Sequence, residues 1–149
     1  MDALSLLNVL AELATASGVA FTVAQLWLAR RQAITDFEDG LAAEYRSLAM
    51  TLPTEALLGG ELDDLDHAKA LAQFYHYFDL SNGQIFLRQK NRVSKRTFIF
   101  WRDGIQANMA RPAFARAWKD ISGRVPGDFE ELRQLIAEDY EIDPNSWNK

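Results

Sequence analysis

Residues 13–29 constrain this chain more than any other segment, because they read LATASGVAFTVAQLWLA and carry no charged side chain. Counted back to Ala3, the run covers twenty-seven residues and contains a single charge, Glu12. A helix needs roughly 20 apolar residues to cross a hydrocarbon core about 30 Å thick. The length therefore predicts a helix that spans a membrane once. Four polar side chains dilute the run: Thr15, Ser17, Thr22 and Gln25.

Two other placements of this segment stay open. The helix could be buried in the core or the oligomer interface of a soluble protein. It could also lie flat in the interface of a membrane, although the run lacks the lysine-rich polar face that is typical of such helices.

The residues that flank the run predict its orientation. Arg30 and Arg31 follow it directly, Trp27 precedes them by one turn, and Met1 and Asp2 carry no positive side chain. Positive residues stay on the cytoplasmic side of a membrane. We therefore expect a protein of the inner membrane whose N-terminus is outside and whose remaining chain is in the cytoplasm. A cleaved signal peptide is not expected, because a basic leader region is absent.

Small side chains recur at every fourth position of the run. They form two rows: Ala14, Gly18 and Thr22, and Ala16, Ala20 and Ala24. Such rows let helices approach closely within a bilayer, so they predict self-association into a homo-oligomer. The alternative is an ordinary alanine-rich helix, since alanine has the highest helix propensity.

The remainder of the chain is predicted to be all-α, because apolar residues recur at spacings of three and four and no segment alternates as a strand would. The predicted fold is an N-terminal hydrophobic, transmembrane helix followed by a small helical bundle. Residues 1–31 form the membrane or association helix, and residues 32–149 form the helical domain. Helix boundaries are expected at these caps and breakers: Pro53, Asp63 or Asp64, Ser94, Pro112 and Asp128.

Three further expectations concern this domain. Ser81-Asn82-Gly83 is expected to break or bend the second long helix, and the tail from Glu141 is expected to be irregular. The core is predicted to contain five aromatic side chains: Phe74, Phe78, Phe98, Trp101 and Trp118.

Charge alternates in sign along the chain. Residues 36–79 contain ten acids and two bases, residues 88–124 ten bases and two acids, and residues 125–149 seven acids and two bases. The blocks either neutralise one another across the fold or leave the basic block free to face an anionic partner.

The densest basic segment lies across a predicted turn and is therefore expected to be an exposed contact surface. It consists of Arg88, Lys90, Arg92, Lys95 and Arg96. Anionic lipid headgroups and the acidic face of a neighbouring subunit or protein partner are the expected contacts. Nucleic acid is not expected, because the chain as a whole carries a net charge of −5. The alternative is a solvated turn with no partner.

The sequence contains few residues that could act in catalysis or bind a metal. There is no cysteine, which excludes disulfides, thiol nucleophiles and cysteine-ligated zinc, and there are two histidines, His67 and His76. Asp63 with His67, and His76 with Asp79, could each share a helix face, but two ligands do not make a metal site. We therefore expect no catalytic residues, no metal and no cofactor.

Two stretches resemble a broad group of uncharacterised bacterial proteins. They are AELATASGVAFTVAQLWLARRQ, and YFDLSNGQIFLRQKNRVSKRTFIFWRDGI followed by RPAFARAWKDI. The resemblance covers most of the chain and implies a single-span protein with a cytoplasmic helical domain, without implying an activity. A looser architectural likeness is to small membrane proteins that accompany RNA-targeting bacterial defence systems and assemble into rings.

One helix also resembles the active helix of a helical nuclease superfamily, in which an arginine is followed by a polar residue and a histidine. Here Arg102, the polar Asp103 and Asn108 stand in that relation, but Asn108 replaces the histidine, and asparagine cannot act as a general acid or base. A degenerate helical RNase is therefore the third functional hypothesis. The first is a non-enzymatic, membrane-anchored protein that self-associates or docks on a partner, in bacterial stress or phage defence. The second is a soluble oligomeric interaction module with its N-terminal helix buried in the assembly.

Overall fold

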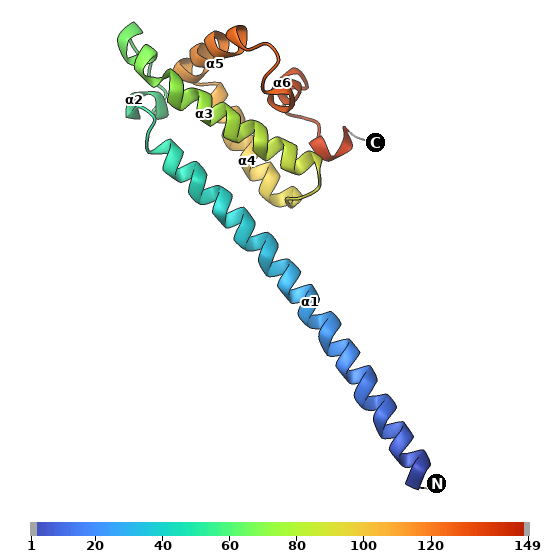
Figure 1. The fold of residues 1–149 in the computed structure, drawn as a ribbon. Helices are drawn as coiled ribbons and strands as arrows, with labels where there is room; N and C mark the ends of the chain where they lie inside the picture. The colour runs from blue at the N-terminus through green and yellow to red at the C-terminus, as the bar shows by residue number, and fades with distance from the viewer. Residues whose placement is uncertain (1–2, 148–149) are drawn as a thin grey trace. The chain divides into compact units, whose positions relative to one another are not determined.

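The computed structural model describes residues 3–147, and all regular structure in this range is helical, which confirms the all-α prediction (Figure 1). The helices are α1 (Ala3–Ala49), α2 (Thr54–Leu57), α3 (Asp64–Gln89), α4 (Lys95–Met109), α5 (Pro112–Arg124), α6 (Glu130–Ala137) and the short 3₁₀ helix η1 (Pro144–Ser146).

The chain divides into two compact units, Met1–Phe37 and Glu38–Lys149. The first unit is helical throughout its described length, as part of α1. Its large apolar side chains are 58–66% exposed over residues 13–28. Within the described part of the chain, no helix combines the length and the apolar character needed to cross a membrane. The structure therefore does not support the predicted transmembrane helix.

The second unit is a helical bundle with α3 at its centre, where α3 contacts α4, α5, α6 and η1 (Figure 1). Phe74 and Tyr77 of α3 meet Phe114 of α5 edge-on, with ring centroids 5.0 and 5.1 Å apart. All three rings are fully buried. Four of the five predicted core aromatics are buried: Phe74, Phe78, Phe98 and Trp101. The fifth, Trp118, is half-buried and packs against the core.

Helix starts follow the expected capping chemistry in two places. The Asp63 carboxylate accepts a hydrogen bond from Asp66 N at 2.8 Å, and the Ser94 hydroxyl accepts one from Thr97 N at 3.1 Å. Glu38 supplies an acid at the start of α4, because its carboxylate accepts from Ser94 N at 2.9 Å and from the Thr97 hydroxyl at 2.7 Å. An acid at this end also interacts favourably with the dipole of α4.

Ser81-Asn82-Gly83 was predicted to break or bend the helix. The predicted break is wrong, because α3 continues without interruption through these residues. The Ser81 hydroxyl donates to the Tyr77 carbonyl at 2.8 Å, which satisfies it within the helix. The side-chain oxygen of Asn82, Oδ1, accepts from Leu132 N at 2.9 Å, and the side-chain nitrogen, Nδ2, donates to the Glu131 carboxylate at 2.9 Å. Asn82 therefore holds the start of α6 from a neighbouring helix.

The predicted cap of the last helix is also wrong. The residue at the N-cap of α6 is Phe129, not Asp128, and no side-chain cap bond forms there. Phe129 has φ 61°, a left-handed conformation that a bulky residue rarely adopts, and its ring is buried against Trp118. Burial of this ring and the bonds from Asn82 replace the missing local cap.

Candidate functional site

In the apolar segment, residues 13–29 of α1, two polar side chains form hydrogen bonds within the helix itself. The Ser17 hydroxyl donates to the Leu13 carbonyl at 2.7 Å, and the Thr22 hydroxyl donates to the Gly18 carbonyl at 2.8 Å. An unsatisfied hydroxyl in an apolar medium costs about 1–3 kcal/mol, and a bond to the carbonyl four residues earlier removes most of this cost. Two of the four polar residues are therefore compatible with an apolar environment.

The residues predicted to mark the membrane–water interface lie at the C-terminal end of this segment. The Arg31 guanidinium lies over the Trp27 ring, 5.5 Å from its centroid. A tryptophan with an adjacent cation is typical of residues at a membrane–water interface.

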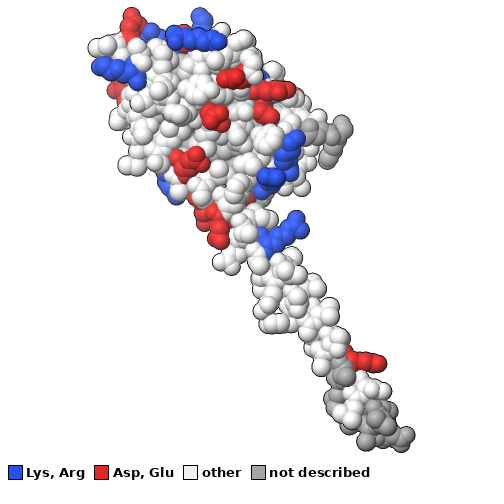
Figure 2. Space-filling model, in the orientation of Figure 1, with Lys and Arg blue, Asp and Glu red and all other residues white. Residues whose placement is uncertain are grey.

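Both rows of small residues lie on the exposed surface of the first unit: Ala14, Gly18 and Thr22, and Ala16, Ala20 and Ala24. A side chain added at Gly18 would meet no atom within 4 Å, so the described residues leave this face open. Figure 2 shows this part of the molecule as a nearly uncharged surface. The structure describes one chain, so association through these rows stays a prediction.

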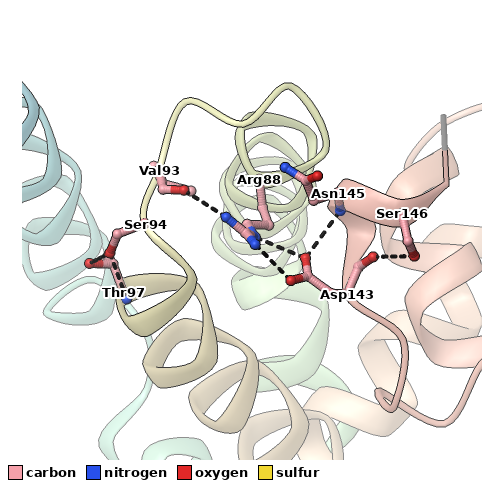
Figure 3. Close-up of polar contacts among 7 residues, drawn as sticks. All are labelled: Arg88, Val93, Ser94, Thr97, Asp143, Asn145 and Ser146. Atoms are coloured by element: carbon pink, nitrogen blue, oxygen red, sulfur yellow. Dashed lines mark hydrogen bonds and ion pairs between the residues drawn. The ribbon is translucent and has the colours of Figure 1, made fainter. Parts of the chain in front are cut away.

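The prediction of an exposed basic surface is wrong for Arg88. This residue is 7% exposed, and its guanidinium binds the Asp143 carboxylate through two hydrogen bonds of 2.8 and 2.7 Å. A third bond of 3.1 Å reaches the Val93 carbonyl (Figure 3). Sequence reasoning treated the tail as irregular and missed this partner, which is 55 residues away.

Residues 143–147 of the tail are therefore part of the bundle. Asp143 also accepts from Asn145 N at 3.1 Å, and the Ser146 hydroxyl donates to the Asp143 carbonyl at 2.7 Å (Figure 3). The hydrogen bond from Arg88 lowers the pKa of the Asp143 carboxyl below its ordinary value of 3.8. The Arg88–Asp143 pair joins α3, the turn before α4 and η1.

The other four bases of the predicted surface are exposed. They are Lys90, Arg92, Lys95 and Arg96. The Lys90 ammonium lies 5.2 Å from the centroid of the Phe86 ring, a cation–π contact. The exposed basic surface thus shrinks from five residues to four.

Ion pairs connect the three charge blocks. Arg88 of the basic block pairs with Asp143 of the last block, and Arg116 pairs with Asp64 of the first at 2.6 Å. On the face of the bundle in Figure 2, acidic and basic side chains are interspersed. Part of the basic block is therefore neutralised within the fold, as the first of the two charge hypotheses expects.

The two residues of the nuclease hypothesis have separate roles. Arg102 pairs with its neighbour Asp103 at 2.8 Å. Asn108 is 5% exposed, and its amide donates to the hydroxyls of Tyr77 and Tyr45 at 2.9 and 3.2 Å. Burial raises the pKa of the Tyr77 hydroxyl, which therefore stays protonated. Asn108 is thus hydrogen-bonded to two tyrosines inside the bundle.

A histidine–aspartate pair was not recognised from the sequence. Nε2 of His67 lies 2.8 Å from the Asp120 carboxylate, and this hydrogen bond lowers the pKa of Asp120. Nδ1 of His67 is buried and has no hydrogen-bond partner among the described residues. The pair joins α3 to α5 at the edge of the bundle.

Neither candidate metal pair gains a third ligand. Within residues 3–147, no group of three or more histidine, cysteine or acidic side chains could hold an ion.

The second unit also contains a pocket of about 430 Å³ between the last part of α1, α3 and α4. Its walls are mainly apolar, with Tyr45 and Trp101 among them, and Arg46, Gln84 and Asp103 add polar groups. Sequence periodicity predicted that Trp101 belongs to the core. The one sequence signal for a cavity next to Trp101 is Gly104, a glycine in the middle of α4.

The chain shows no match to any protein-family model, any curated protein or any solved structure. The function is therefore argued from the geometry of these surfaces.

The Arg88–Asp143 pair predicts a specific effect of acid on stability. Asp143→Asn should lower the free energy of unfolding by about 2 kcal/mol at neutral pH, because a buried guanidinium loses its charged partner. The folded pKa of Asp143 is depressed, so its contribution is complete above 3.8 and is lost as the pH falls through the folded pKa. The gap between the variant and the natural protein should therefore close in acid, as measured by urea unfolding at a series of pH values.

Glu141→Gln is the matched control, because Glu141 is an exposed acid in the same tail. It should change the free energy of unfolding by less than about 0.5 kcal/mol. An equal loss in both variants, or a gap that persists in strong acid, would show that the pair does not hold the tail.

Proposed function

We propose that this protein is a non-enzymatic, membrane-anchored helical protein that self-associates through its apolar segment and presents the helical bundle to a partner. The observation that carries the proposal is the set of exposed large apolar side chains of residues 13–28, which point in several directions around the helix.

The geometry of a helix supports this directly. Successive residues point about 100° apart, so Leu26, Trp27 and Leu28 face three different directions. They are 66, 59 and 58% exposed. Large apolar side chains that point in several directions favour an apolar medium over contact with one flat partner surface. Lipid is the simplest medium of this kind, and the row of Ala14, Gly18 and Thr22 is where a second helix could pack.

The polar residues of the segment are compatible with lipid. Ser17 and Thr22 bond to carbonyls of their own helix. The sequence extends the run on its N-terminal side with Val9, Leu10 and Ala11, whose side chains lie outside those that the structure describes. Arg30 and Arg31 favour an orientation with the N-terminus outside the inner membrane and the bundle in the cytoplasm.

The alternative is a soluble oligomer in which copies of the segment cover one another. The rows of small residues favour it, because they allow close helix contact in protein as well as in lipid. A nuclease is not supported, because Asn108 is held by two tyrosine hydroxyls inside the bundle. A role in stress or phage defence stays a prediction from the architectural likeness.

Alkaline carbonate extraction of membranes tests the anchor. The full chain should stay in the membrane pellet, and Val19→Lys with Val23→Lys should move it to the supernatant, since each lysine near a bilayer centre costs about 3 kcal/mol. Ala68→Lys with Ala72→Lys is the control, because it adds the same charges at the same spacing on an exposed face of α3. Release of the natural protein by carbonate would favour the soluble oligomer.

Leucine substitutions in the two rows test self-association. Gly18→Leu or Ala20→Leu should weaken association about tenfold, which corresponds to about 1.4 kcal/mol, because the larger side chain keeps the helices apart. Val23→Leu, outside both rows, should have little effect. Energy transfer between labelled copies in lipid vesicles measures the change. A monomeric natural protein, or unchanged association in both row variants, would sink this part of the proposal.

A further inference from the structure

The pocket in the second unit has the features of a small-molecule site. Its volume of about 430 Å³ lies within the range of ligand pockets, roughly 300–1,000 Å³. Trp101 and Ile105 of α4 and Tyr45 of α1 form apolar walls, and Phe100, which is 78% exposed, stands at its rim.

Gly104 lines this pocket from the interior of α4. Glycine in the middle of a helix is unfavourable relative to alanine, so a reason for it is expected in the packing. A Cβ built at Gly104 would meet no atom within 4 Å. No close contact in the bundle therefore requires glycine at this position. The absence of a side chain at Gly104 leaves space in the pocket.

Two polar groups of the lining lack partners among the described residues. Gln84 lines the pocket, and its side chain forms no hydrogen bond to another described residue. Its amide can therefore donate to or accept from a polar group of a ligand in the pocket. Arg46 is exposed at the pocket and forms no ion pair, whereas the nearby Asp103 is already paired with Arg102.

We propose that this pocket binds a single-chain carboxylic acid, a fatty acid or its hydroxylated form. The chain would lie against Trp101 and Ile105, the carboxylate would meet the free guanidinium of Arg46, and Gln84 would bond to an oxygen of the ligand. One turn of an α-helix, about 10–12 Å wide and 5.4 Å long, would by itself fill or exceed this volume. A small ligand therefore fits better than a helix of a partner. The proposal is independent of what covers residues 13–29.

The experiment is photo-crosslinking of the full chain in lipid nanodiscs with a dodecanoic acid that carries a diazirine on its chain. Mass spectrometry should locate the label in residues 42–46 and 99–105. Free dodecanoate and 3-hydroxydodecanoate should compete, and dodecanol should compete at least tenfold less well, because it lacks the charge that Arg46 pairs.

Three variants make the test specific. Gly104→Leu should fill the pocket and abolish the label there, while Gly123→Leu, at an exposed glycine of α5 with equal space, should retain it. Arg46→Gln should weaken competition by dodecanoate about tenfold and leave competition by dodecanol unchanged. Circular dichroism of each variant verifies that the helices are intact.

Label confined to residues 13–29 would overturn the proposal, because it reports only the surrounding lipid. Equal labelling of the pocket in Gly104→Leu and in the natural protein would also overturn it. So would equal competition by dodecanoate and dodecanol.

Discussion

An apolar helical surface that its own unit does not cover is the constraint on which the account of this protein depends. Residues 13–28 expose large apolar side chains in several directions around the helix, and the hydroxyls of Ser17 and Thr22 donate to backbone carbonyls of the same helix. Exposed apolar surface of this extent is unfavourable in water and marks an interaction site. The proposed function therefore rests on what covers this surface.

The bundle itself is organised by α3 and by polar side chains that reach across long sequence distances. Arg88 holds the tail through Asp143, Asn82 holds the start of α6, and Glu38 holds the start of α4. Each of these bonds satisfies a charge or a backbone group that would otherwise be unpaired. They explain why short helices such as α6, which would be marginal in isolation, are stable here.

Much of the fold could be predicted from the sequence, because periodicity and local caps are local signals. The starts at Asp63 and Ser94 and the buried aromatics Phe74 and Phe98 follow from such signals. The roles of Arg88 and Phe129 could not be predicted, because charge does not reveal burial and the groups that stabilise them come from distant segments. The pocket could not be predicted for the same reason, because Gln84 and Gly104 line one cavity only once α3 and α4 pack side by side.

The most direct test of the central claim is the accessibility of a spin label at a single cysteine introduced at Val23, which is feasible because the chain contains no cysteine. In vesicles, the account predicts that the label collides readily with oxygen, which concentrates in lipid, and rarely with a water-soluble nickel complex. Ready collision with the nickel complex would place the segment in water, and exclusion of both reagents would place it inside protein. Either result would contradict the account.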